Sequence, residues 1–176
     1  MAPLIAIVGA ESTGKTALSL ALAAKLGGVA VPELLRAWCD REGRTPRPDE
    51  QAAIAAAQTA AIDAAALTAK VVVCDTTALM TAIYSDYLFQ DASLYPAALA
   101  FHRRCALTLL TALDLPWVAD GLQRDGPHVR APVDTAIRLA LASGGVGWQL
   151  VAGQGEARVQ TALLACRASD QLRMPQ

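Results

Sequence analysis

The stretch that decides the fold is Leu4-Ile5-Ala6-Ile7-Val8-Gly9-Ala10-Glu11-Ser12-Thr13-Gly14-Lys15-Thr16. An apolar run meets a glycine, a second glycine follows after four intervening residues, and Lys15-Thr16 then opens a helix-patterned segment. The spacing G-x-x-x-x-G-K-T is the P-loop (Walker A) pattern. A chance match is the alternative, but a buried strand before the motif and a helix after it are what the mechanism requires. The motif therefore predicts an α/β protein that binds a polyphosphate.

The P-loop also predicts the donor side of the chemistry. Gly9 and Gly14 allow backbone conformations that a Cβ would forbid, so successive N–H groups can converge on an anion at a helix N-terminus. Lys15 would reach the β- and γ-phosphates of ATP, and the Thr16 hydroxyl would ligate Mg²⁺. The expected nucleotide-binding residues are Gly9, Glu11, Ser12, Thr13, Gly14, Lys15, Thr16 and Ala17.

Composition limits the other function classes. The 176 residues suit a single domain, residues 1–176, and 54% hydrophobic against 18% charged residues is typical of a globular chain. A net charge of −1 gives no bulk attraction to nucleic acid or anionic lipid, and no apolar run is long enough to span a bilayer. The four cysteines are widely spaced and form no zinc pattern. We expect a cytoplasmic protein that needs neither nucleic acid nor membrane, and the sequence does not specify an oligomeric state.

Strand and helix patterns alternate along the whole chain. This alternation predicts a three-layer α/β domain with a parallel sheet. The expected strands are 4–8, 29–31, 71–74, 107–110 and 148–151, and the expected helices are 15–26, 34–40, 49–69 (capped by Asp49), 78–89, 96–104, 133–142 and 156–168.

Two carboxylates follow strands and so belong at the carboxyl edge of the sheet, where open α/β sheets bind ligands. Asp75 ends the strand at 71–74 and could hold Mg²⁺ opposite Thr16, or it could cap the next helix. Glu33 follows the strand at 29–31 and could accept a proton from an acceptor hydroxyl, or it could be a solvated residue in the first turn of a helix. Both alternatives stay open at this point.

Further residues are candidates for the acceptor side and for a lid. Arg36 lies one turn after Glu33, and Tyr84 belongs to an aromatic cluster that could stack a flat ring. The segment at about 119–130 is the expected lid, where Arg124 and Arg130 could close over transferring phosphates. An ordinary solvated basic loop is the alternative for that segment.

The class of P-loop protein follows by elimination. No N-K-x-D tetrapeptide selects guanine, and no ABC-type signature such as L-S-G-G-Q occurs. A short P-loop domain with strand-end carboxylates and an arginine-bearing lid is the layout of a small-molecule kinase. The rival from another class is an ATPase or nucleotide-sensing module that acts through a protein partner.

The chain resembles the ribosylnicotinamide kinase domains of the NadR family and their stand-alone AAA-type ATPase relatives in NAD metabolism. The similarity lies in collinear stretches over nearly the whole chain: residues 5–16, Val31-Pro-Glu-Leu-Leu-Arg36, Cys74-Asp-Thr76, Pro116-Trp-Val-Ala-Asp-Gly-Leu122, and Val151-Ala-Gly153 with Arg158. The chain departs from the family at Thr77, where the family has an acidic residue, and at Gln123, where the family often has an arginine.

The resemblance implies a nucleoside/nucleotide-kinase-like fold with five strands in the order 2-3-1-4-5. It implies transfer of the ATP γ-phosphate to the 5′-hydroxyl of nicotinamide riboside, with ATP and Mg²⁺ as cofactors. By the same resemblance Glu33 and Asp75 face the acceptor and the metal, Trp117 begins the lid and contacts substrate, and Arg158 lies near the adenine. Because Thr77 replaces an acidic residue, another nucleoside-like acceptor stays open.

Overall fold

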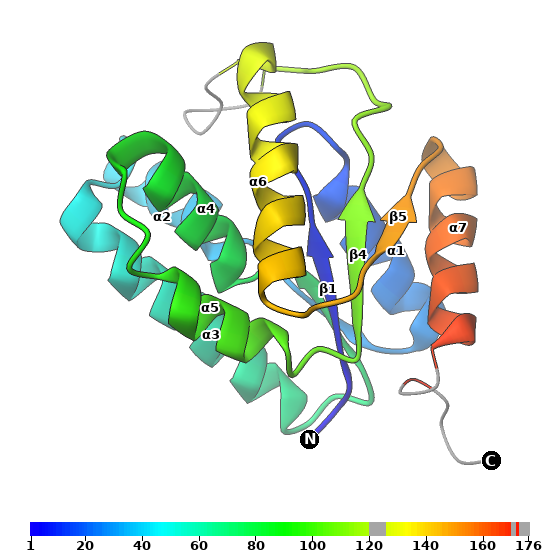
Figure 1. Ribbon diagram of the computed structural model, residues 1–176. Helices are drawn as coiled ribbons and strands as arrows, with labels where there is room; N and C mark the ends of the chain where they lie inside the picture. Colours follow the sequence, from blue (N-terminus) through cyan, green and yellow to red (C-terminus); the bar gives the residue numbers. More distant parts are fainter. Residues whose placement is uncertain (120–125, 170–171, 173–176) are drawn as a thin grey trace.

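The computed structural model describes residues 1–119, 126–169 and 172 of the chain. Five parallel strands form one sheet in the order β2-β3-β1-β4-β5, which confirms the predicted fold class and strand order (Figure 1). The apolar, β-branched runs suit strands that helices cover on both faces. The strands are β1 (Leu4–Val8), β2 (Val29–Val31), β3 (Val72–Asp75), β4 (Leu107–Thr111) and β5 (Gln149–Val151).

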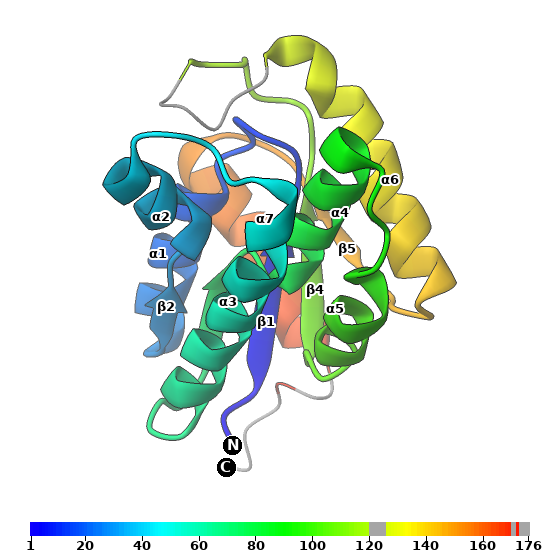
Figure 2. The ribbon, with the colours of Figure 1, turned by 90° about the vertical axis from the view of Figure 1, so that its left-hand side faces the viewer.

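Helices cover the two faces of this sheet unequally. On one face α1 and α7 pack together, and on the other lie α3, α4, α5 and α6 (Figures 1 and 2). The helices are α1 (Lys15–Leu26), α2 (Leu34–Glu42), α3 (Gln51–Ala66), α4 (Ala78–Phe89), α5 (Tyr95–His102), α6 (Arg130–Ser143) and α7 (Gly155–Ala168), with the 3-10 turns η1 (Pro48–Glu50) and η3 (Pro127–Val129).

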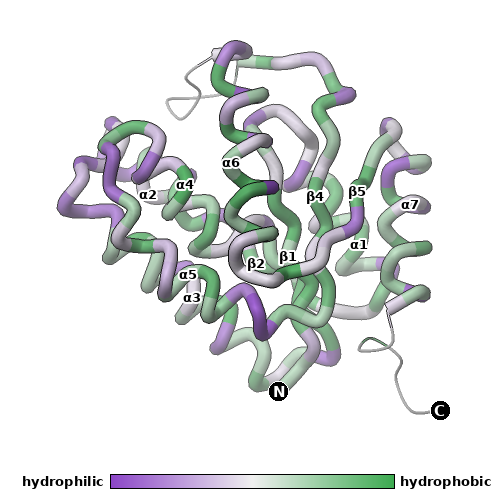
Figure 3. Tube along the Cα trace, viewed as in Figure 1, coloured by the Kyte–Doolittle hydropathy of each residue, from purple (hydrophilic) through white to green (hydrophobic). Residues whose placement is uncertain are grey.

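The core follows from strand alternation. Ile5 and Ile7 of β1 pack with α1 and α7, whereas Leu4 and Val8 point to the opposite face. All five residues of β1 are buried, and the hydropathy of the chain is high along these inner strands (Figure 3). The central strand therefore anchors both halves of the core.

Strand register brings the candidate site together at one edge. Ile7 of β1 pairs with Asp75, and Val31 at the end of β2 pairs with Cys74. The P-loop after β1, Asp75 at the end of β3 and the residues after β2 consequently meet at the carboxyl edge of the sheet.

Most helix positions agree with the sequence patterns, but the helix predicted from 133 begins three residues earlier, at Arg130, and the start predicted at Asp49 is also wrong. The predicted bounds of 15–26 and 78–89 are those of α1 and α4. The helix predicted from Asp49 instead begins with η1, and α3 follows from Gln51, so Asp49 lies inside the 3-10 turn and does not cap the helix. None of the described helices is long and apolar enough to cross a membrane.

Candidate functional site

The P-loop is held in shape by a side chain from β4. Thr13 Oγ1 donates to the Ala10 carbonyl at 2.7 Å, and the same hydroxyl lies 2.7 Å from Thr111 Oγ1 at the end of β4. A Cβ on Gly9 would overlap Thr111 Oγ1, so the first glycine of the motif makes room for this contact. Gly14 has a φ of 76°, the left-handed conformation that glycine adopts without strain. Sequence analysis did not identify Thr111.

The start of α1 is suited to a phosphate. Its N-terminus has no acidic residue in the first turn and no side-chain cap, so its N–H groups and helix dipole can act on an anion. Lys15 Nζ donates to the Ala10 carbonyl at 2.9 Å and so stays folded over the loop. Thr16 is exposed beside it. This is the arrangement in which backbone donors and an ammonium group hold a polyphosphate.

Asp75 is suited to act as a magnesium ligand. The residue is 2% exposed, and its Oδ1 has no hydrogen-bond partner among the described residues. Because strand residues alternate, Asp75 shares the face of Val73, which packs on α1, and this places the carboxylate on the side of Thr16. No group of three metal-ligating side chains occurs in the described part, so the ion would need phosphate oxygens and water as further ligands, as Mg²⁺ usually does.

Asp75 does not cap α4. Thr77 takes that role, because its Oγ1 accepts a hydrogen bond from the Leu79 amide at 3.3 Å. The Thr77 hydroxyl also lies 3.1 Å from Nδ1 of His102, whose Nε2 lies 2.9 Å from Thr108 Oγ1. Burial lowers the pKa of His102 to about 4. The residue that replaces the family's acidic side chain is therefore part of a buried, uncharged network.

A cavity of about 610 Å³ joins the P-loop to the acceptor-side candidates. Lys15 and Thr16 line one side, and Glu33 and Arg36 at the start of α2 line another. Helix α4 adds a mostly apolar wall that includes Tyr84. Of the predicted site residues, the cavity brings together Glu11, Ser12, Thr13, Gly14, Lys15, Thr16, Ala17, Glu33, Arg36 and Tyr84.

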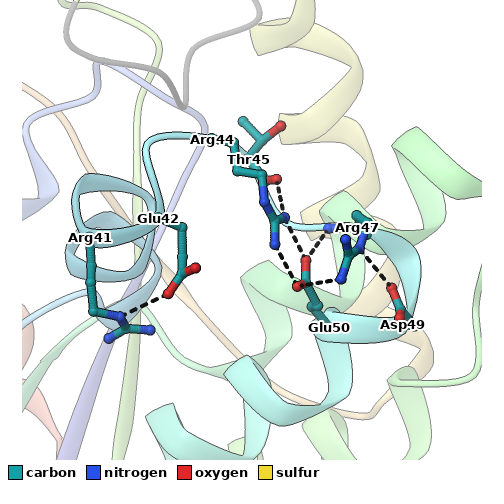
Figure 4. A network of polar contacts seen from close by, with 7 residues as sticks. All are labelled: Arg41, Glu42, Arg44, Thr45, Arg47, Asp49 and Glu50. Carbon is teal, nitrogen blue, oxygen red and sulfur yellow. Dashed lines mark hydrogen bonds and ion pairs between the residues drawn. The ribbon is translucent and has the colours of Figure 1, made fainter.

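The loop between α2 and α3 forms another wall and is fastened by Glu50. The Glu50 carboxylate accepts two hydrogen bonds at 2.7 Å from Arg44, and two more from the Arg47 amide and guanidinium (Figure 4). The hydrogen bond from Arg44 is the largest of the contacts that lower the pKa of Glu50 to about 2. Thr45 and Pro46, which lie between these partners, line the cavity.

The segment before the expected lid lies on the P-loop. Trp117 Nε1 donates to Glu11 Oε2 at 3.0 Å, and the Val118 amide and carbonyl both bond to the Ser12 hydroxyl. The family resemblance implies that Trp117 contacts substrate, but this residue is not among those that line the cavity. Its indole holds a P-loop side chain, and its contact with substrate stays a prediction.

Arg158 is buried against the P-loop. Its side chain is 4% exposed, and the guanidinium donates to the carbonyls of Thr13, Ala112 and Gly153 at 2.8, 3.2 and 2.8 Å, and to Asp114 Oδ1 at 3.0 Å. Burial acts to raise the pKa of Asp114, but hydrogen bonds from the Gly153 amide and from Arg158 outweigh it and lower the pKa. Arg158 therefore braces the P-loop against the ends of β4 and β5, and its predicted place near the adenine stays a prediction.

Only one of the two expected lid arginines lies among the described residues. Arg124 lies outside the described residues. Arg130 begins α6 directly after η3, and its Nε and Nη2 atoms are buried without a hydrogen-bond partner among the described residues. A buried guanidinium with unsatisfied donors is suited to an anion.

Comparisons with known proteins agree with this geometry. A family model described as an AAA domain matches residues 4–158. Comparison with curated proteins finds no match. Among solved structures, the chain is similar to NadR protein in complex with NR, at a TM-score of 0.81 and 18% identity over 99% of this chain and 52% of that one.

Two more structures share the fold. NadR protein in complex with NAD and AMP-PNP has a TM-score of 0.77 and 17% identity over 99% of this chain and 51% of that one. Deoxyadenosine kinase from M. mycoides with bound dCTP has a TM-score of 0.61 and 12% identity, over 94% of this chain and 99% of that one. The chain spans about half the length of the NadR chains, and it shares with all three structures the P-loop kinase fold.

Proposed function

The chain belongs to the AAA domain family, and we propose that it is an ATP- and Mg²⁺-dependent kinase for a small nucleoside-like acceptor. The reaction would transfer the γ-phosphate to the 5′-hydroxyl of the acceptor, with nicotinamide riboside the first candidate. The observation that carries the proposal is the shared cavity, in which the phosphate-binding P-loop and the Glu33 carboxylate line one space of about 610 Å³. Its size is within the range of small-molecule sites.

The donor half of the reaction rests on Lys15 and the P-loop amides. Lys15 Nζ is held by the Ala10 carbonyl and would turn to the β- and γ-phosphates when ATP enters. Arg130, with buried guanidinium donors that the described residues leave unsatisfied, would neutralise charge on the transferring group. A bound Mg²⁺ ion, held through Asp75 and Thr16, would supply further neutralisation of the phosphate charge.

The acceptor half rests on Glu33. Its carboxylate would accept the proton of the attacking hydroxyl and orient that oxygen toward the γ-phosphorus. Tyr84 would face the flat base of the acceptor, and Arg36 would stand beside Glu33 in the same wall. Phosphoryl transfer depends mostly on positioning and electrostatics, so the reaction does not require a strongly activated base.

The ligands of the similar structures support this choice of acceptor. NR is bound in one NadR structure, AMP-PNP in another, and dCTP in the deoxyadenosine kinase. Those ligands belong to those proteins, and the shared fold makes nucleosides the acceptors to try first on this chain.

A nucleoside panel tests the proposal. The purified protein is incubated with Mg²⁺, ATP and one nucleoside at a time, and mass spectrometry records any acceptor that gains a phosphoryl group. We expect nicotinamide riboside or a related nucleoside to be phosphorylated at the 5′ position, and Lys15→Ala to abolish the product. ATP hydrolysis that no nucleoside changes would contradict the kinase and favour an ATPase or a nucleotide sensor.

A matched pair of variants tests the role of Glu33. Glu33→Gln keeps the shape but cannot take a proton, so we expect kcat to fall by about 10²- to 10⁴-fold while ATP binding is kept. Glu42→Gln, at the other end of α2, is the control and should behave as wild type. Loss of ATP binding in the Glu33 variant would place this residue on the donor side.

A further inference from the structure

We propose that Gln58 of α3 is a positioning residue for the transfer reaction, because its side-chain amide holds the backbone on both sides of Glu33. The inference rests on the proposed function, in which Glu33 orients the acceptor hydroxyl. Gln58 is 3% exposed and is not among the residues that line the cavity, so it acts through Glu33 and not on the acceptor.

Two hydrogen bonds carry the proposal. Gln58 Oε1 accepts from the Leu34 amide at 2.8 Å, and Gln58 Nε2 donates to the Pro32 carbonyl at 3.1 Å. Pro32 contributes the carbonyl of the peptide group before Glu33, and Leu34 contributes the N–H of the peptide group after it. With both flanking peptide planes held, the φ of −67° and ψ of 109° at Glu33 are fixed, and so is the direction of its Cβ.

The sequence of α3 makes this placement unusual. The buried stripe of the helix consists of apolar residues and two glutamines, Gln51 and Gln58. Burying an amide costs free energy unless all its groups are bonded, and an apolar residue would pack at this position without that cost. Gln51 lines the cavity, whereas Gln58, two turns further along α3, does not, and it uses both ends of its amide on the residues next to Glu33.

A purely structural role is the competing explanation, since the Leu34 amide is one of the donors at the start of α2 that the helix itself leaves unpaired. The two roles differ in what a substitution changes. A helix cap affects stability alone, whereas a positioning residue affects the chemical step. An error of about 1 Å in the placement of a reacting group can cost about 10²-fold in rate.

Two variants separate these explanations. Gln58→Met keeps the volume and removes both hydrogen bonds, so kcat for nucleoside phosphorylation should fall by about 10- to 100-fold while KM for ATP stays within about twofold of wild type. Gln58→Glu keeps the acceptor and can donate to the Pro32 carbonyl only when its carboxyl is protonated. The ratio of its kcat to that of wild type should therefore rise as the pH falls, whereas the ratio for Gln58→Met stays flat.

The control is Thr108→Val, which removes a buried hydrogen bond to His102 at a distance from the cavity and should lower stability without changing kcat. A Gln58→Met protein with wild-type kcat, or a Gln58→Glu ratio that does not depend on pH, would overturn the inference. If Gln58→Met does not fold, the pH-dependent ratio of Gln58→Glu decides alone. If the wild-type protein phosphorylates no nucleoside, both the proposed function and this inference are wrong. If the wild type is active and Gln58→Met has the same kcat, only the inference is wrong.

Discussion

Replacing Arg158 with methionine would distinguish a brace from a nucleotide contact. The methionine keeps part of the buried aliphatic stem but removes four hydrogen bonds, three to the carbonyls of Thr13, Ala112 and Gly153 and one to Asp114. Because the Arg158 side chain is only 4% exposed, water cannot replace those donors without opening the structure. The P-loop would lose its attachment to the strands behind it.

The contacts set the size of the effect. Removing one partner of a buried ion pair costs about 3–5 kcal/mol. The side chain of Asp114 is 34% exposed and can be rehydrated, so the lower end, about 3 kcal/mol, applies here. For a domain of this size 1 kcal/mol corresponds to about 2–4 °C, so the melting temperature should fall by about 6–12 °C.

Thermal unfolding followed by circular dichroism, with and without ATP, measures this effect. The control is Arg167→Met on the exposed side of the same helix, which should change the free energy of unfolding by less than about 0.5 kcal/mol. An unchanged melting temperature with ATP binding abolished would refute the brace, and it would restore the direct nucleotide contact that the family resemblance implies for Arg158.

Three other predictions test the metal site, a buried histidine outside the cavity, and the P-loop. Asp75→Asn should lower kcat by at least about 10²-fold and raise the Mg²⁺ concentration needed for half-maximal rate, as a metal titration would show. Because burial lowers the pKa of His102 to about 4, protons bind the unfolded chain preferentially as the pH falls from about 6.5 to 4. The free energy of unfolding should then fall by about 3 kcal/mol over that range, and urea titrations of His102→Gln should lack this part of the slope. Gly9→Ala should abolish ATP binding in calorimetry because its Cβ overlaps Thr111 Oγ1, and Thr111→Ala in the same chain should partly restore it.

The fold could be predicted because its signals are local. The apolar run before Gly9 and the similar run before Asp75 identify the two central strands, and the Gly27 stop gives the end of α1 at Leu26. The exact residue at which a strand ends and the next helix begins is harder to predict, since the helix cap depends on the conformation of a single side chain. Thr77 caps α4, although aspartate, the residue type of Asp75, is also favoured at helix N-caps.

The candidate site could be predicted on the cavity side only. Lys15, Glu33 and Arg36 lie next to strand ends, and the rule that parallel strands gather ligands at one edge is enough to place them. The contacts that Trp117 and Arg158 make with the P-loop could not be predicted, because their partners are 106 and 145 residues away in the chain. No periodicity or spacing in a single sequence reports such pairings, and the ligand contacts that the family resemblance implies for both residues stay predictions.

The loop fastened by Glu50 is a wall of the cavity whose polar contacts lie within the loop itself. The polar contacts of Glu50 that the structure describes all lie within residues 44–50, and Thr45 and Pro46 are carried between them (Figure 4). The P-loop, in contrast, is anchored by partners from distant parts of the chain. Under the proposed function, we expect that exchange of residues 44–50 changes the preference for the acceptor and leaves the P-loop contacts unchanged. Related chains should diverge fastest in this loop, and loop exchange between them is the direct way to transplant acceptor preference.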